Sequence, residues 1–155
     1  QQQLLTFIEP SHFEDYKKQY LSTAQLESVP FKMQGHLPIL ETSIKNKTLS
    51  FALDCGAESN LIDDHLFSSL QSATLDLTTD DLIGMDNNRK EVKKGKIEAM
   101  QIGKKTFKAL PTLYSNIEHL KEGYQLSIDG LIGYPVFSRQ KTLLSFQRKE
   151  LVFIE

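Results

Sequence analysis

Hydrophobic and polar residues alternate in short runs along most of the chain after residue 30, and turn-forming residues separate the runs. Alternation with a period of two is typical of β-strands that bury one face. The turn formers include Lys45-Asn46-Lys47, between two such runs. The pattern predicts a mainly antiparallel, all-β domain. Its expected strands are Leu37–Ile44, Thr48–Leu53, Ile97–Ile102, Thr106–Leu113, Thr142–Phe146 and Leu151–Ile154.

The first part of the chain has a different pattern. Aromatic residues recur at helical spacing between positions 13 and 20, which predicts a short amphipathic helix over residues 12 to 22. Ser11 and Glu14 have the spacing of a capping box at its start, and Val29-Pro30 closes the segment. We therefore divide the chain into an N-terminal extension, residues 1–30, and a β domain, residues 31–155.

Helical patterns inside the β domain are few and short. One is Asp63–Leu70, where Asp63 or Asp64 is expected to cap the first turn, and the other is Ser115–Leu120. The sequence thus predicts an all-β lobe with one or two short helices in addition to the N-terminal helix.

Length and charge narrow the class of protein. The chain has 155 residues, the size of one domain, and it contains no run of the roughly 20 apolar residues that a membrane-spanning helix needs. The lack of such a run predicts no membrane span. The net charge of −2 and the pI of about 6.1 predict no nucleic-acid partner. The basic residues between Arg89 and Lys96 alternate with acidic ones and indicate a solvated hairpin.

Cysteine and histidine usage argues against metal and disulfide chemistry. Cys55 is the only cysteine, which excludes an internal disulfide, and the histidines are scattered without metal-ligand spacing. We therefore expect no metal and no cofactor. The chain begins with Gln1 rather than Met, from which we expect export to a periplasmic or extracellular compartment after removal of a leader.

The segment with the clearest chemical signal is Leu49–Asp63. An apolar strand leads directly into Asp54, followed by Gly56 and Ala57. A carboxylate at the end of a buried strand is costly unless its oxygens are hydrogen-bonded, and glycine allows the sharp turn that brings backbone N–H groups toward it. Taken alone, Asp-x-Gly favours an ordinary turn between two strands, because the tripeptide is common in turns.

The surroundings of this tripeptide resemble the active-site loop of single-lobe, retropepsin-like aspartic peptidases. In that family an apolar strand precedes Asp-Thr/Ser-Gly-Ala, and an apolar pair follows; here Phe51–Ile62 has this pattern. A second family signature, two apolar residues and a glycine before a short helix, resembles Ile128–Phe137, with Leu131, Ile132 and Gly133 at its centre. The resemblance covers about Phe31–Glu155.

The resemblance implies a closed acid-protease lobe and aspartic endopeptidase activity on peptides or proteins. In this family a water is activated between two carboxylates that share one proton. One lobe supplies one such carboxylate, so the resemblance implies a homodimer in which Asp54 of each subunit forms half of the catalytic dyad. Cys55, Gly56 and Ala57 would complete the active-site loop.

Other residues are candidates for substrate binding. Glu58 stands where relatives carry an acid that contacts the substrate backbone, although it also fits a role as a loop cap. The flap of the family corresponds to Leu82–Arg89, in which Gly84 and Met85 would lie over the substrate. The alternative interpretation of this segment is a plain surface hairpin.

Cys55 departs from the family pattern, which has Thr or Ser there. A thiol is a weaker donor and acceptor than the hydroxyl that joins the two active-site loops in the family. The alternative function is therefore a non-catalytic descendant that binds an extended peptide. A further hypothesis makes Cys55 a nucleophile with His65 as its base, although no oxyanion motif is visible.

Overall fold

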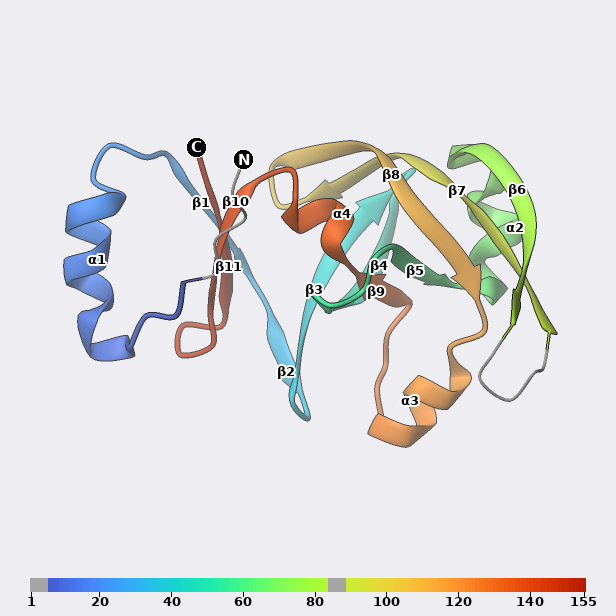
Figure 1. Ribbon diagram of the computed structural model, residues 1–155, viewed down its shortest axis with the longest axis horizontal. Coiled ribbons are helices and arrows are strands. Elements are labelled where there is room, and N and C mark those ends of the chain that lie inside the picture. The colour runs from blue at the N-terminus through green and yellow to red at the C-terminus, as the bar shows by residue number, and fades with distance from the viewer. Residues whose placement is uncertain (1–5, 84–88) are drawn as a thin grey trace.

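The computed structural model describes residues 6–83 and 89–155 and shows a mostly β protein with an N-terminal helix (Figure 1). The strands are β1 (Leu26–Pro30), β2 (Lys32–Gln34), β3 (Leu37–Ile44), β4 (Lys47–Leu53), β5 (Asn60–Asp63), β6 (Thr74–Ile83), β7 (Arg89–Ile102), β8 (Lys105–Ser115), β9 (Gly130–Ile132), β10 (Lys141–Ser145) and β11 (Glu150–Ile154). The helices are α1 (Phe13–Tyr20), α2 (Phe67–Leu70), α3 (Glu118–Tyr124) and α4 (Tyr134–Phe137), with 3-10 turns η1 (Pro10–His12), η2 (Asp64–Leu66) and η3 (Gln71–Ala73).

Eight strands form one sheet in the order β2-β3-β4-β9-β5-β8-β7-β6. A pairing between β3 and β7, at Ser43 and Gln101, closes six of these strands into a barrel. Most neighbours are antiparallel, but β9 runs parallel to β4 and β5 runs parallel to β8. The closed, mainly antiparallel lobe predicted from the sequence is confirmed.

A second sheet joins the strand before the barrel to the last two strands of the chain. It has the order β1-β11-β10, with Val29 opposite Leu151, and it lies between α1 and the barrel (Figure 1). Helix α1 is attached to the turn before β11, where the Arg148 guanidinium pairs with Glu14 and lies 4.8 Å from the ring centre of Phe13. Strand β1 thus precedes the division at residue 30 but pairs with the β domain; the division itself stays a prediction.

The core follows from the alternation of side chains along the strands. Phe51 and Leu53 of β4 are buried with Ile62 of β5 and Ile132 of β9 in the main hydrophobic cluster inside the barrel. Their neighbours Ala52, Leu61 and Leu131 belong to a second, smaller cluster. The three strands around the predicted active-site loop therefore carry apolar residues on both faces, as strands covered on both sides do.

The helix predicted near the N-terminus is confirmed, but its predicted capping box is wrong. Pro10–His12 forms a 3-10 turn, so Ser11 lies inside that turn rather than at the start of α1. The N-cap of α1 is His12, which makes no side-chain cap hydrogen bond. Pro10 begins a 3-10 turn that runs directly into α1 at Phe13, which moves the cap position beyond Ser11.

The main difference in strand boundaries is the long hairpin of β6 and β7. The alternation predicted a strand from Ile97, whereas β7 begins at Arg89, and β6 was not predicted as a strand. Residues 75–79 of β6 are exposed, and β6 pairs with β7 along a single edge. Cross-strand pairing rather than burial maintains this exposed part of β6, so the sequence gives no sign of a buried strand face there.

Candidate active site

Asp54 lies in the loop directly after β4, beside the segment that contains Gly133. Its backbone N–H donates to the Ile132 carbonyl at 2.9 Å, which extends the pairing of β4 with β9 by one residue. The carboxylate oxygen Oδ1 accepts from the Gly56 N–H at 3.0 Å, and the Asp54 carbonyl accepts from the Ala57 N–H at 3.1 Å. Asp54 is exposed, so the loop presents a carboxylate whose Oδ1 is held by one backbone donor, the Gly56 N–H.

The second signature segment is fastened to this loop. The Tyr134 N–H donates to the Ala57 carbonyl at 2.8 Å, and the Gly133 N–H donates to Oδ1 of Asn60 at 2.9 Å. A Cβ at position 133 would lie 2.5 Å from the Ala57 carbonyl oxygen and 2.7 Å from that of Ser59. Only a residue without a side chain allows this approach. The sequence brought these two segments together only by resemblance, and the structure shows them in contact.

Asn60 is a structural residue of the site that the sequence did not single out. Its side chain is fully buried, and Oδ1 links β5 to Gly133. Its Nδ2 has no hydrogen-bond partner among the described residues. Nothing in the sequence distinguishes Asn60 from its polar neighbours Glu58 and Ser59, because only the threading of β9 past the loop buries it.

Gly130 explains how β9 fits between β4 and β5. A Cβ there would lie 2.0 Å from the Leu61 carbonyl oxygen and 2.6 Å from Cε1 of Phe51. Its neighbour Asp129 also binds β4: the Asp129 N–H donates to the Ser50 carbonyl at 2.7 Å, and its Oδ2 accepts from the Ser50 N–H at 2.8 Å. Asp129 is therefore occupied in holding strands together at the end of β9 away from Asp54.

The remaining predicted site residues lie in different parts of the chain, and not all of them are among the described residues. Cys55 and Glu58 are exposed in the active-site loop, and their roles stay predictions. Gly84 and Met85 lie outside the described residues, although β6 and β7 form the hairpin that would carry them. His65, the base of the thiol hypothesis, lies against Asp63, with 3.0 Å between its Nδ1 and the Asp63 Oδ1.

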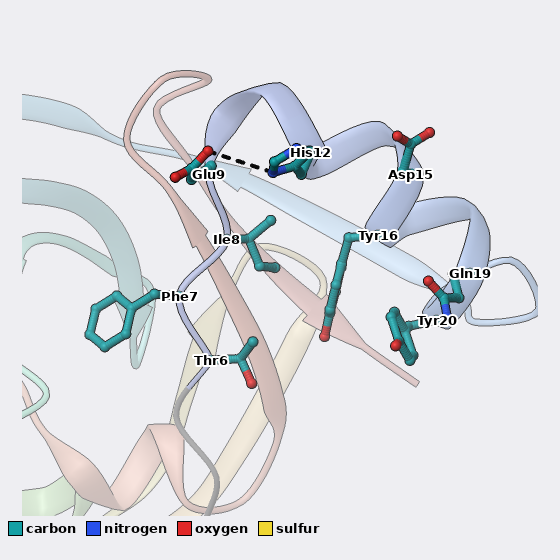
Figure 2. A pocket seen from close by; sticks show the side chains of 9 residues that line it. All are labelled: Thr6, Phe7, Ile8, Glu9, His12, Asp15, Tyr16, Gln19 and Tyr20. Atoms are coloured by element: carbon teal, nitrogen blue, oxygen red, sulfur yellow. Dashed lines mark ion pairs between the residues drawn. The ribbon is translucent and has the colours of Figure 1, made fainter.

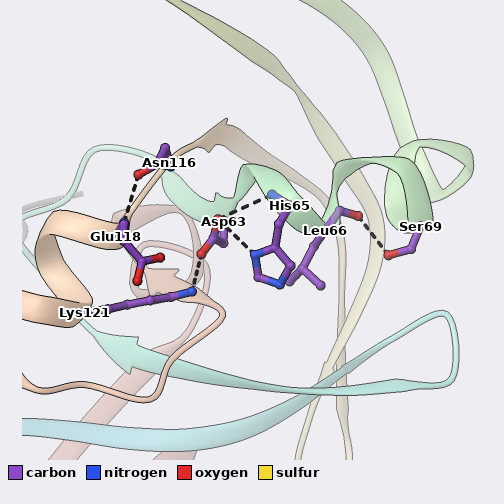
Figure 3. A network of polar contacts seen from close by, with 7 residues as sticks. All are labelled: Asp63, His65, Leu66, Ser69, Asn116, Glu118 and Lys121. Atoms are coloured by element: carbon purple, nitrogen blue, oxygen red, sulfur yellow. Dashed lines mark hydrogen bonds and ion pairs between the residues drawn. The ribbon is translucent and has the colours of Figure 1, made fainter.

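Asp63 anchors a polar network at the end of β5 (Figure 3). Its side chain is only 5% exposed; its carboxylate pairs with Lys121 of α3 and accepts from the His65 N–H at 3.4 Å, as a cap of η2 does. Burial opposes ionisation of Asp63, but the hydrogen bonds from Lys121 and His65 together outweigh it and lower the pKa of Asp63. The capping role was predicted; the ion pair was not.

A separate pocket of about 450 Å³ belongs to the N-terminal extension. Figure 2 shows Tyr16 and Tyr20 of α1 facing the segment with Phe7 and Ile8. None of the predicted site residues lines it. In the described parts of the chain, no group of acidic, histidine or cysteine side chains is arranged to hold a metal ion. Those parts also contain no helix long and apolar enough to cross a membrane.

Comparisons with known proteins agree with this arrangement. The family model for aspartyl proteases matches residues 40–136, which include both the Asp54 loop and the segment around Gly133. Among solved structures, the chain is similar to a retropepsin-like aspartic protease from Rickettsia conorii, with a TM-score of 0.55 and 16% identity over 84% of this chain and 91% of that one. No curated protein matches the sequence. The structural likeness shows a retropepsin-like fold, and the match over most of the chain shows that this protein belongs to the aspartyl protease family.

Proposed function

We propose that the chain is an aspartic endopeptidase that works as a homodimer, with a water activated between the Asp54 carboxylates of two subunits. The observation that carries this proposal is the exposed Asp54 carboxylate at the end of β4, oriented by the Gly56 N–H and fastened to β9. The loop orients the carboxylate through Oδ1, and the exposure of Asp54 leaves the group accessible to water and substrate.

The chemistry follows from two carboxylates at close range. Two like charges a few ångströms apart are not both ionised near neutral pH, so the pair holds one proton. The ionised carboxylate takes a proton from water as the oxygen attacks the peptide carbonyl, and the protonated one donates to the carbonyl oxygen. The carboxyl that took the proton from water then gives it to the amide nitrogen, the other carboxylate takes a proton back from a hydroxyl of the tetrahedral intermediate, and the C–N bond breaks to release acid and amine.

The engagement of nearby acids supports the need for a second subunit. Asp63 is paired with Lys121, and Asp129 accepts from the Ser50 N–H. Both carboxylates already have partners within the chain and lie toward the end of β9 that begins at Gly130, whereas Asp54 follows the end at Ile132. Neither Asp63 nor Asp129 is therefore placed to join Asp54, and in the proposal the second carboxylate of the dyad comes from Asp54 of another copy.

The first testable prediction is that Asp54→Asn abolishes peptide cleavage at every pH while the melting temperature stays near that of the wild type. An amide retains the shape of the side chain but neither accepts the proton from water nor gives one to the carbonyl. Cleavage is followed by mass spectrometry on a mixture of unfolded proteins. Exposed Glu41→Gln, a substitution on β3, serves as a control for the loss of one carboxylate. Cleavage at the wild-type rate by Asp54→Asn contradicts the mechanism.

The second candidate function is binding of an extended peptide without cleavage. It is favoured by Cys55, which replaces the hydroxyl residue of the family with an exposed thiol that hydrogen-bonds weakly. Isothermal titration with an intact peptide, followed by a search of the mixture for cleavage products, distinguishes the two functions. Tight binding to the wild-type chain without any cleavage product supports binding without cleavage.

A further inference from the structure

A segment containing α3 covers one face of the three strands that position Asp54. This α3 segment, residues 117–128, contributes the buried side chains Ile117, Leu126 and Ile128 to the smaller hydrophobic cluster, and Leu120 packs against that cluster. The strands contribute Ala52 of β4, Leu61 of β5 and Leu131 of β9.

The covered face is the one on which Asp54 lies. Side chains alternate between the two faces of a strand, so Ala52 and a residue two positions later share a face when the strand continues. The hydrogen bond from the Asp54 N–H to the Ile132 carbonyl shows that the pairing with β9 continues to Asp54. The α3 segment is therefore a neighbour of the Asp54 site on its own side of the sheet.

The side-chain attachments of this segment lie away from Asp54. Lys121 pairs with the nearly buried carboxylate of Asp63, whose own N–H donates to the Asp129 carbonyl at 2.8 Å, at the opposite end of β9 (Figure 3). On the other flank, the Ser127 N–H donates to Oε1 of Gln34 at 2.9 Å, in the β2–β3 hairpin. The ion pair thus connects α3 to β5 without touching the Asp54 loop.

The charged groups around the pair keep both partners ionised. Asp63 faces Lys121 and His65. Lys121 also interacts electrostatically with Glu118 of its own helix and with Asp129 before β9. The hydrogen bond that Lys121 donates to Asp63 raises the pKa of Lys121, and the bonds that Asp63 accepts from Lys121 and His65 lower the pKa of Asp63. The contact therefore persists in the mildly acidic range, where a carboxylate dyad retains one proton.

We propose that Asp63 and Lys121 form a latch that positions the α3 segment beside Asp54, and that the latched segment sets the width of the substrate site on that side. Both are positioning residues, since they act through the apolar cluster and not on the reacting atoms. The inference rests on the proposed function, because it assumes that an extended peptide binds at Asp54, next to the part of this face that the α3 segment covers.

The experiment compares Lys121→Met and Asp63→Asn with the wild type. Methionine retains an apolar stem but has no charge, so α3 should loosen while the Asp54 loop is left intact. We expect amide hydrogen exchange in residues 117–128 to accelerate about tenfold or more, KM for a peptide substrate to rise several-fold and kcat to change less than twofold. The exposed pair Lys96–Asp76 provides the matched control, Lys96→Met, with no effect on these readouts.

A second readout does not depend on cleavage. Pepstatin bound to the wild type should slow exchange in residues 117–128, and Lys121→Met should reduce that protection. Exchange that accelerates in Lys121→Met with unchanged KM, or no added protection of the segment by pepstatin, overturns the latch. Asp54→Asn, tested in parallel, separates this failure from failure of the proposed function. Loss of cleavage in Asp54→Asn supports the peptidase mechanism, whatever result the Lys121 and Asp63 variants give.

Discussion

Two glycines show at the scale of single residues why this loop has the sequence it has. Gly133 passes between the carbonyl oxygens of Ala57 and Ser59, and Gly130 passes between Leu61 and Phe51. Each close approach brings β9 against the loop that presents Asp54. The absence of a side chain at both positions therefore allows this close packing. A side chain at either position would push the second signature segment away from Asp54.

We predict that Gly133→Ala destabilises the protein by about 1–3 kcal/mol, the usual cost of forcing extra atoms into a packed site. The new Cβ would lie 2.5 Å and 2.7 Å from backbone carbonyl oxygens, which are unable to rotate away as a side chain does. Gly123→Ala is the control, because a Cβ at that position in α3 meets nothing within 4 Å. Helix propensity should make the control neutral or more stable by up to about 1 kcal/mol. Urea unfolding measures both; equal stabilities would contradict the prediction.

Cys55 provides a second prediction at this scale. In the proposed dimer, Cys55→Thr should raise peptidase activity, or create it where the natural chain is inactive, because a hydroxyl donates and accepts more strongly than a thiol. Each new hydrogen bond across the axis would stabilise the dimer by about 0.5–1.5 kcal/mol. Cleavage assays and light scattering with reductant test this, and Cys55→Ala controls for loss of the thiol. If Cys55→Thr is neither more active nor more dimeric, residue 55 does not join the two loops.

At the scale of elements, the site is an assembly of three strands and one covering helix. β9 lies between β4 and β5, and α3 closes the face opposite the main core. The one nearly buried ion pair in the described residues that joins α3 to this unit is Asp63–Lys121. The stability of this arrangement should consequently depend on pH through these two groups.

We predict that Asp63→Asn lowers the free energy of unfolding by about 1–3 kcal/mol at pH 7, between the values typical of exposed and buried pairs. Because the folded-state pKa of Asp63 is lowered, the ion pair stabilises the protein above the unfolded-state pKa of about 4 and loses its effect as pH falls through the folded-state value. The difference between Asp63→Asn and wild type should accordingly shrink in acid. Thermal unfolding at pH 7 and below pH 4 checks this, and a constant difference would refute it.

At the scale of the whole molecule, the proposed homodimer raises the question of how its two subunits would meet. The small sheet β1-β11-β10 brings residues 26–30 against the C-terminal hairpin, and its outer strands β1 and β10 each pair along one edge among the described residues. Unpaired strand edges are templates for pairing with another chain. The proposed dimer would bring two Asp54 loops together about a two-fold axis.

The dimer proposal leads to a prediction about dilution. If each active site needs two chains, the specific activity should fall as the protein is diluted below the dimer dissociation constant, and the decline should follow the dimer fraction measured by light scattering or ultracentrifugation. Mixing wild type with excess Asp54→Asn should also suppress activity, since heterodimers carry one carboxylate. Specific activity that stays constant at protein concentrations where the chain is monomeric would contradict a dyad shared between subunits.

The sequence by itself determined the class of the fold and the place of Asp54. Alternating residues predicted β3 with its observed ends, Leu37–Ile44, and the strand before Asp54, because burial of one strand face leaves a local signature. The helix α1 had a similar local pattern. In the long β6–β7 hairpin only Ile97–Ile102 left such a signature; residues 75–79 of β6 are exposed and paired across strands rather than buried.

Only the tertiary structure decided how the site is held together. Asn60 is buried and bonded to Gly133 because β9 passes beside the loop, across 73 residues of sequence. The contact between Asp63 and Lys121 likewise arises because α3 returns over β5. Polar residues make such contacts through distant partners, and their local sequence carries no mark of which partner the fold supplies.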